Sequence, residues 1–367
     1  MPTRGLNVLV VITSAHRRGA EIEGMQLTSR LAAAGCTARV VALAGGGDSA
    51  LPVTVLGSSP TSPSTLRALR RAARGTDVVI GYGSSTLPAC ALALGGTRTP
   101  FIYRSIGDPA AWVRGALHKR RTAMLFRRAA HVVTLSETSS ESVADLYGVP
   151  PHRRDVTPNA RAPDDFRPPT NDERTAARER WSVPPDSPLA VTIGALSPEK
   201  QTWLAAGAAA EIDGLTLLIA GDGPERDRVA AAAARVPDQR VRLLGQIDDP
   251  VGLLHAADVL VLTSSTEGMP GVVIEAGLCG VPVVATDVGM VGELVVDGES
   301  GVIVEAAETT MIAAAIERVL EDRERFGQRA LEHTREHFVW DAVLPTWLDV
   351  LHRVTAPPGE RSRLRNK

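Results

Sequence analysis

The chain has 367 residues, of which 44% are hydrophobic and 22% are charged, and its formal net charge is −2 at pH 7. This length suits two globular domains, and the near-neutral charge argues against nucleic-acid binding, which needs a basic surface. The first apolar run is too short for a signal peptide, and no run reaches the length of a membrane-spanning helix. Three scattered cysteines without a C-x-x-C pair predict reduced thiols in a cytoplasmic protein.

Short apolar runs alternate with alanine-rich helical segments through the first half of the chain. Strands that alternate with helices of this length predict an α/β domain with a parallel sheet and right-handed crossovers. The predicted strands are residues 8–12, 39–43, 77–80, 100–103 and 131–135, and the predicted helices are 21–34, 66–73 and 113–129.

The last of these helices is basic over residues 114–128, with His118, Arg121 and Arg128 near one face. Such a helix could contact anionic lipid at the inner face of a membrane, or a phosphorylated acceptor. The alternative is a solvated polar face on a packed helix, with Leu117, Met124 and other apolar residues turned inward. Both interpretations stay open at this point.

The second half of the chain repeats the alternating pattern after a stretch, 150–169, that is dense in proline and charge and predicts a surface linker. We predict domains at 1–165 and 170–337, then a helix at 338–355 with large apolar residues at helical spacing. Residues 356–367 have no apolar periodicity, and we expect disorder there. The strands predicted in the second domain are 190–193, 216–220, 241–244, 259–262, 281–285 and 301–304.

One segment of the second half carries the clearest chemical signal. Residues 267–275 read Glu-Gly-Met-Pro-Gly-Val-Val-Ile-Glu, which puts two carboxylates eight positions apart between a predicted strand and a predicted helix. Open parallel sheets bind ligands beyond the carboxyl ends of their strands, and a helix that begins there offers N–H groups to an anion. Carboxylates on either side of a bound phosphate can accept hydroxyl hydrogen bonds, which suits a sugar nucleotide.

This segment, followed by Gly-Val-Pro-Val-Val-Ala, resembles the retaining GT-B glycosyltransferases of family 4. The resemblance covers most of the chain and is strongest over residues 190–304. It implies two Rossmann-like, doubly wound domains that face each other across a cleft, the first for the acceptor and the second for the donor, with the helix 338–355 returning to the first. Further similar segments occur in the family's order at residues 18–21, 156–166, 194–200, 217–224, 241–245 and 256–264.

The resemblance implies a nucleotide-diphosphate sugar as donor, with a UDP-sugar as first choice and a GDP-sugar next, and it implies no metal or other cofactor. Lys200 matches the family's diphosphate-binding lysine, and its position at a helix start, unfavourable for a cation, itself argues for an anionic partner. Glu267 should contact sugar hydroxyls, and Glu275 should accept hydrogen bonds from the ribose diol. The remaining donor-binding candidates are Gly19, Gly194, Met269, Gly271 and Val272.

The sequence departs from the family where it usually has an arginine, because Ala195 stands there. Replacement cations could be Arg17, Arg18 or Arg104, or the site could depend more on backbone amides. Arg18 also replaces the first glycine of the family's segment after the first strand.

The catalytic base is the least defined part of the predicted site. The family often has a histidine after the fourth strand, whereas here Arg104, Ser105 and Asp108 are the available groups on the acceptor side. Asp108 could take the acceptor proton or could cap the turn before Pro109. Retaining enzymes of this type are thought to let the leaving phosphate oxygen accept the proton, which would form an α-glycosidic bond without a protein base.

The sequence leaves the acceptor open among a small molecule, a sugar and a lipid-linked compound. Two other functions also stay open. The missing arginine and histidine would suit a nucleotide-sugar binding protein that does not transfer. A nicotinamide oxidoreductase is a weaker alternative, because no G-x-G-x-x-G follows the first strand.

Overall fold

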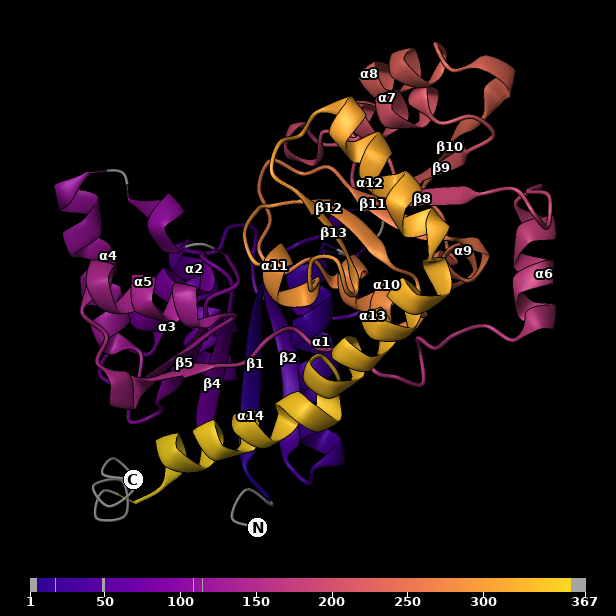
Figure 1. The fold of residues 1–367 in the computed structure, drawn as a ribbon. Coiled ribbons are helices and arrows are strands. Elements are labelled where there is room, and N and C mark those ends of the chain that lie inside the picture. Colours follow the sequence, from indigo (N-terminus) through magenta and orange to yellow (C-terminus); the bar gives the residue numbers. More distant parts are fainter. Residues whose placement is uncertain (1–4, 17, 48–49, 108, 114, 358–367) are drawn as a thin grey trace. The chain divides into compact units, whose positions relative to one another are not determined.

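The computed structural model describes residues 5–16, 18–47, 50–107, 109–113 and 115–357, without the side chains of residues 111 and 112. The chain divides into two compact units. The first consists of Met1–Asn159 and Trp340–Lys367, and the second of Ala160–Val339. Each unit is built on one parallel sheet with helices packed against it, as the alternating pattern predicts (Figure 1).

The first unit has a seven-stranded sheet in the order β3-β2-β1-β4-β5-β6-β7. All of its pairings are parallel. Its strands are β1 (Asn7–Ser14), β2 (Thr37–Ala44), β3 (Thr54–Val55), β4 (Val78–Tyr82), β5 (Phe101–Arg104), β6 (His131–Thr134) and β7 (Arg154–Val156). Its helices are α1 (Gly19–Ala33), α2 (Pro63–Ala72), α3 (Thr86–Ala93), α4 (Ala116–Arg128), α5 (Glu137–Tyr147) and α14 (Trp340–Thr355), with short 3-10 turns η2 (Pro109–Trp112) and η3 (Pro151–Arg153).

The central strands of this sheet are covered on both faces, which is why they read as continuous apolar runs. Every residue of β4 is buried. The last helix, α14, closes one side of the unit, and its Trp347 ring stacks on Tyr82 with the ring centroids 6.3 Å apart. Trp347 is fully buried, so the helix that ends the described chain is part of the first unit's core.

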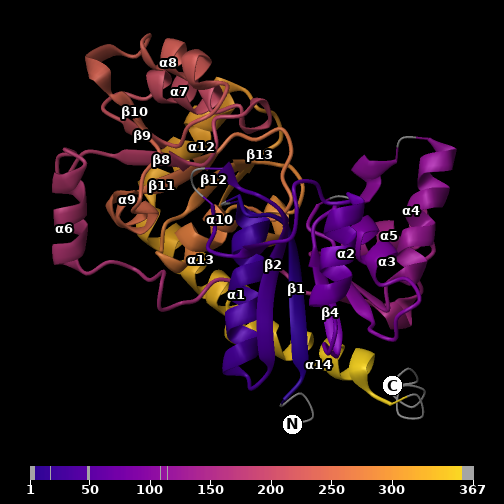
Figure 2. The same ribbon diagram turned by 180° about the vertical axis from the view of Figure 1, so that it is seen from behind.

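The second unit has a six-stranded parallel sheet in the order β10-β9-β8-β11-β12-β13. Figure 2 shows α6 beside α9 at the edge of this unit. The strands are β8 (Leu189–Ile193), β9 (Thr216–Ala220), β10 (Val241–Gly245), β11 (Val259–Leu262), β12 (Val283–Thr286) and β13 (Gly301–Val304). The helices are α6 (Asn171–Arg180), α7 (Trp203–Glu211), α8 (Arg226–Ala233), α9 (Pro250–Ala256), α10 (Gly271–Leu278), α11 (Val291–Leu294), α12 (Thr309–Glu321) and α13 (Arg323–His337), with 3-10 turns η4 (Pro198–Lys200) and η5 (Pro237–Gln239).

Both sheets follow the doubly wound order, in which the chain changes direction once. In the second unit this change falls between β8 and β11, and in the first between β1 and β4. Ligands of such sheets bind beyond the carboxyl ends of the strands at this switch point. The loops after β8 and β11 are therefore where a ligand of the second unit is expected.

The segment predicted as a linker, 150–169, is partly regular structure. Residues of η3 and β7 lie in it, and β7 extends the first sheet by pairing with β6. The second unit begins at Ala160 because the next residue is tied to that unit: the Arg161 N–H donates to the carbonyl oxygen of Phe338 at 2.9 Å. Of the tail predicted to be disordered, residues 358–367 lie outside the described residues, while Ala356 is buried.

Candidate functional site

Lys200 and Glu267 meet at the switch point of the second unit. The Lys200 Nζ lies 2.6 Å from the Glu267 Oε1, although 67 positions separate the two residues. Ser264, which follows β11, donates its hydroxyl to the same oxygen at 2.6 Å. The side chain of Glu267 is 8% exposed and that of Lys200 is 28% exposed. The arrangement is a partly buried ion pair between the loop after β8 and the loop after β11.

The loop that carries Lys200 is held by hydrogen bonds from the loop after β11. The Thr263 hydroxyl donates to the carbonyl oxygens of Lys200 and Gln201 at 3.0 and 3.1 Å. Gln201 adopts a left-handed conformation with φ of 46°, which turns the chain sharply after the lysine. These contacts fix the backbone of Lys200 while leaving its ammonium group accessible.

A third loop, after β12, supports Glu267 from the other side. Gly289 has φ of +58°, and a Cβ there would lie 2.0 Å from the Glu267 carbonyl oxygen. The Thr286 hydroxyl donates to the Ser264 carbonyl oxygen at 2.6 Å. The sequence analysis missed Ser264, Thr286 and Gly289, and the signal that could have pointed to them is their position just beyond predicted strands.

Two further predicted residues lie next to Lys200. Gly194 and Ala195 follow β8, and together with Lys200 and Ser264 they line a cavity of about 20 Å³. Gly194 has φ of +155°. A Cβ on Gly221 would lie 1.7 Å from the Gly194 carbonyl oxygen, so the absence of a side chain on Gly221 lets the loops after β8 and β9 contact each other. Ala195 is exposed, so the position where the family has arginine points no cation into this site.

Helix α10 begins at Gly271, shortly after Glu267 in the sequence. Pro270 precedes it, and no side chain caps its N-terminus. The first N–H groups of a helix have no partner within it, so those of Gly271 and Val272 are suited to an anion. Met269, predicted to pack on the donor, is instead 5% exposed and lies in the interior.

Glu275, on the second turn of α10, is paired with an arginine that the sequence analysis did not select. The Arg161 Nε donates to the Glu275 Oε1 at 2.7 Å, and the side chains are 6% and 17% exposed. The guanidinium also lies against Gly271, where a Cβ would be 1.8 Å from the Arg161 Nη2. No motif in the sequence marks Arg161, because its pairing with Glu275 joins residues 114 positions apart.

The acceptor-side candidates of the first unit are not all placed as predicted. Arg104 is fully buried and donates to the carbonyl oxygen of Thr134 at 2.8 Å and to the Glu23 Oε1 at 3.3 Å. It is an internal cation of the first unit, with no exposed surface for an acceptor or a diphosphate. Ser105 is also buried. Asp108 and Arg17 lie outside the described residues.

The loop after β1 remains open to solvent. Arg18 and Gly19 are exposed, and a Cβ on Gly19 would meet no atom within 4 Å. Glu21, on the first turn of α1, is buried, and this burial raises the pKa of its carboxyl, opposed by hydrogen bonds and by the nearby charge of Arg18. Arg18 is thus the one described residue among the proposed replacement cations that solvent reaches.

Helix α4 does not bury the apolar face that the packed-helix alternative requires. Phe126 is buried, but Leu117 and Met124 are 65% and 64% exposed, two helical turns apart on one face. The neighbouring Arg120 and Arg121 are exposed as well. Within the described residues, no helix is long and apolar enough to cross a membrane.

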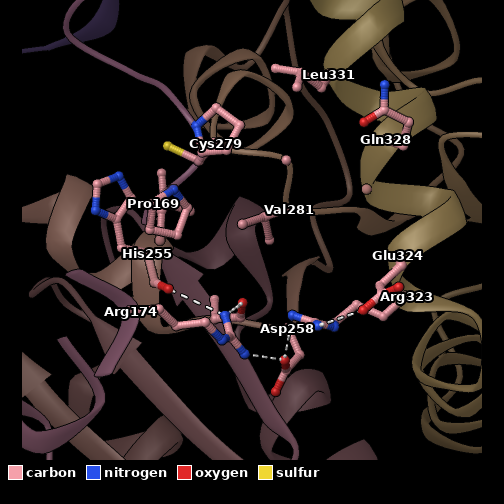
Figure 3. Close-up of a pocket in the computed structure, with 15 residues that line it drawn as sticks. Pro169, Arg174, His255, Asp258, Cys279, Val281, Arg323, Glu324, Gln328 and Leu331 are labelled. Atoms are coloured by element: carbon pink, nitrogen blue, oxygen red, sulfur yellow. Dashed lines mark hydrogen bonds and ion pairs between the residues drawn. The ribbon is translucent and has the colours of Figure 1, made fainter. Parts of the chain in front are cut away.

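A larger cavity, of about 320 Å³, lies at the amino ends of strands β11 and β12 (Figure 3). Asp258, directly before β11, is bonded there by Arg174 at 2.6 Å and lies 3.3 Å from Arg178 and 3.2 Å from Arg323. Its Oδ2 also accepts the N–H of Leu189. These contacts join α6, α13 and two strands, which is a structural role. Among the described residues, no group of three or more His, Cys, Asp or Glu side chains could hold a metal ion.

Comparison with known proteins matches both halves of the chain to one class. Residues 173–333 match the family "Glycosyl transferases group 1", and residues 4–160 match the "Glycosyl transferase 4-like domain". Residues 173–333 are therefore a group 1 glycosyltransferase domain, and residues 4–160 are a glycosyltransferase 4-like domain. The pair of Lys200 and Glu267 lies within the group 1 match, and these matches give no support to a nicotinamide oxidoreductase.

Curated glycosyltransferases are about a third identical to the chain over the parts that align. The lipopolysaccharide core biosynthesis glycosyltransferase LpsE of Rhizobium meliloti is 32% identical over 178 residues, which are 47% of this chain and 52% of LpsE. The D-inositol 3-phosphate glycosyltransferase of Mycobacterium bovis is 30% identical over 238 residues, 59% of this chain and 48% of that protein. The chain thus spans about half the length of the curated relatives it matches.

Solved structures confirm the predicted GT-B fold. HepE from Anabaena in complex with UDP has a TM-score of 0.82 at 21% identity, covering 94% of this chain and 99% of HepE. Sucrose-phosphate synthase from Thermosynechococcus elongatus has a TM-score of 0.83 at 20% identity, covering 95% of this chain and 99% of that chain.

Proposed function

We propose that this chain is a retaining, metal-independent glycosyltransferase that takes a sugar from a UDP-sugar and forms an α-glycosidic bond with a hydroxyl acceptor. The observation that carries the proposal is the pair of Lys200 and Glu267 beside the uncapped N-terminus of α10. The UDP and UDP-glucose complexes of HepE support a uridine donor, and a GDP-sugar is the next choice.

The proposed reaction assigns a role to each of three groups. The ammonium group of Lys200 and the free N–H groups of α10 are placed to stabilise negative charge as the diphosphate leaves. Glu267 has one oxygen engaged by Lys200 and Ser264, so its other oxygen can accept a sugar hydroxyl. Asp108 remains a candidate base, but the leaving phosphate oxygen can take the acceptor proton on the same face of the sugar.

A donor panel tests this function. Thermal unfolding is measured with UDP, GDP, ADP and TDP, because a bound nucleotide raises the midpoint by mass action. The nucleotide with the largest shift identifies the base of the donor. The transfer product made from a sugar donor with that base is then examined by NMR, which assigns its anomeric configuration. Stabilisation by UDP and an α-linked product are expected. Binding of none of the four, or a β-linked product, would contradict the proposal.

The alternative of a binding protein without transfer rests on Ala195, which removes one cation from the usual site. Donor hydrolysis measured at saturating UDP-sugar separates the two functions, because a glycosyltransferase slowly passes the sugar to water. A protein that binds UDP-sugar but releases no UDP over hours would favour the alternative.

For the acceptor we propose a lipid-linked compound at the inner membrane face, reached from the cytoplasm. The exposed Leu117 and Met124 beside basic side chains on α4 support peripheral contact through residues 114–128. Sedimentation with vesicles of phosphatidylglycerol should retain the protein, and vesicles of phosphatidylcholine should not. Equal recovery with both would leave a soluble sugar or small molecule as the better acceptor.

A further inference from the structure

Arg161 makes the most unusual side-chain contact of the second unit's site. Its guanidinium reaches α10 and donates to the Glu275 Oε1 at 2.7 Å, although 114 positions separate the two residues. The side chain is 6% exposed, so this is a nearly buried ion pair. Burying a charge is costly unless it is paired and hydrogen-bonded, and here each side chain is the partner of the other.

The guanidinium bonds its own segment at one point, where its Nη1 donates to the Ala160 carbonyl oxygen at 3.1 Å, but the segment has other anchors. The Arg161 backbone N–H already donates to the carbonyl oxygen of Phe338 at 2.9 Å, and Arg161 forms a parallel bridge with Val339. The side chain instead lies along the first turn of α10, where Gly271 leaves the space that its Nη2 occupies. The contact is therefore directed at α10 and Glu275.

The contact also orients Glu275. One carboxylate oxygen is held by a charged hydrogen bond, which leaves the other, Oε2, as the acceptor for a ligand. A carboxylate that stays ionised and fixed is a better acceptor for two neighbouring hydroxyls than a mobile one, because less entropy is lost on binding.

We propose that Arg161 is a positioning residue that holds Glu275 ready for the 2′,3′-diol of the donor's ribose. This inference rests on the proposed function, since it needs a nucleotide in the second unit. It assigns to Arg161 the discrimination between ribose and deoxyribose nucleotides, whereas Lys200 and the N-terminus of α10 act on the diphosphate.

The test compares the affinities of UDP and 2′,3′-dideoxy-UDP by calorimetry. The wild type should prefer UDP by about ten- to a hundredfold, the size expected for hydrogen bonds to a charged group. In Arg161→Met, which keeps the length of the side chain without its charge, this preference should fall below about threefold while dideoxy-UDP binds as before. Glu275→Gln should lose the preference as well, and the double variant should lose no more.

Two variants keep the result specific. Arg161→Lys retains a cation without the planar fork and should restore part of the preference. Arg329→Met removes an exposed arginine paired with Glu332 on α13 and should leave the preference unchanged. If Arg161→Met fails to fold, Arg161→Lys and Glu275→Gln carry the comparison.

The outcomes separate this inference from the proposed function. Full retention of the preference in Arg161→Met, or an equal loss of affinity for both nucleotides, would overturn the positioning role. A wild type that binds UDP without any preference for the diol would overturn the inference alone. A wild type that binds no nucleoside diphosphate would overturn the proposed function and this inference with it.

Discussion

Replacing Lys200 by methionine is the most direct test of the proposed chemistry. The substitution keeps an unbranched side chain of similar length and removes the charge that faces the Glu267 carboxylate at 2.6 Å. It therefore removes a cation from the site while changing the packing little. The effect on turnover and the effect on stability can be worked out separately.

The expected loss of turnover is large. Removing one group that stabilises negative charge in a transition state costs about 10²–10³ in kcat, or about 2.7–4 kcal/mol. The stability cost is smaller, because Ser264 still donates to Glu267 at 2.6 Å and the lysine is 28% exposed. We expect about 1–2 kcal/mol, discounted for solvent screening, which lowers the midpoint of a unit of this size by about 2–8 °C.

The assay measures UDP release at saturating donor. The thermal unfolding midpoints of the wild type and Lys200→Met are measured in parallel, so that their activities are compared at a temperature where both proteins are folded. Lys119→Met, on α4 of the first unit, is the matched control and should keep the wild-type rate with soluble substrates. A Lys200→Met protein that is folded and turns over at the wild-type rate would refute the role given to Lys200.

Three further changes have predictable effects. Gly289→Ala should slow turnover at least about tenfold and destabilise the protein by about 1–2 kcal/mol, because φ is +58° and the new Cβ would clash with the backbone of Glu267. The control is Gly292→Ala, where the nearest atom to a new Cβ is 4.0 Å away. It should change neither the rate nor the thermal unfolding midpoint. Arg104→Met should destabilise by about 3–5 kcal/mol by leaving the buried Glu23 without its ion pair, as thermal unfolding would show, and adding Glu23→Gln should recover part of that loss. Burial lowers the pKa of His131, although the hydrogen bond with Asp155 and the charge of its carboxylate act to raise it. The native state then binds fewer protons than the unfolded chain below about pH 6.5, so stability falls as the pH drops through that range, and His131→Gln should flatten the decline measured by denaturant unfolding.

The strands could be predicted from the sequence where they are buried and apolar, but the buried, apolar helix α3 was missed because it lacks the polar face that gives a helix its periodic pattern. All six strands of the second unit were found, because parallel strands covered on both faces read as continuous runs. The short edge strands β3 and β7 were missed, since an edge strand with polar residues has no such run. Helix α5 was missed because it is rich in serine, although Ser136, whose hydroxyl accepts the N–H of Ser139, and the left-handed Gly148 mark its two ends.

The candidate site was less predictable because it depends on contacts between distant segments. The spacing of Glu267 and Glu275 was readable, but the partner of each was not. Lys200 was selected for an anionic ligand, and its pairing with Glu267 depends on how the loops after β8 and β11 approach each other. Arg104 was selected as a cation near a strand end, and its burial depends on the packing of the whole first unit.

The two ion pairs together explain how the second unit holds its charges without a ligand. Glu267 is paired with Lys200 and Glu275 with Arg161, so the four charges sum to zero around the first turns of α10. Each cation lies within hydrogen-bond distance of its carboxylate, and charge-assisted hydrogen bonds of this kind fix the orientation of both groups. A diphosphate that arrives at α10 shares Lys200 with Glu267 and meets helix N–H groups that no side chain caps. When UDP binds, Lys200 exchanges part of its contact with Glu267 for a contact with the diphosphate. The affinity for UDP should therefore fall less steeply with salt concentration than it would at a site of unpaired cations.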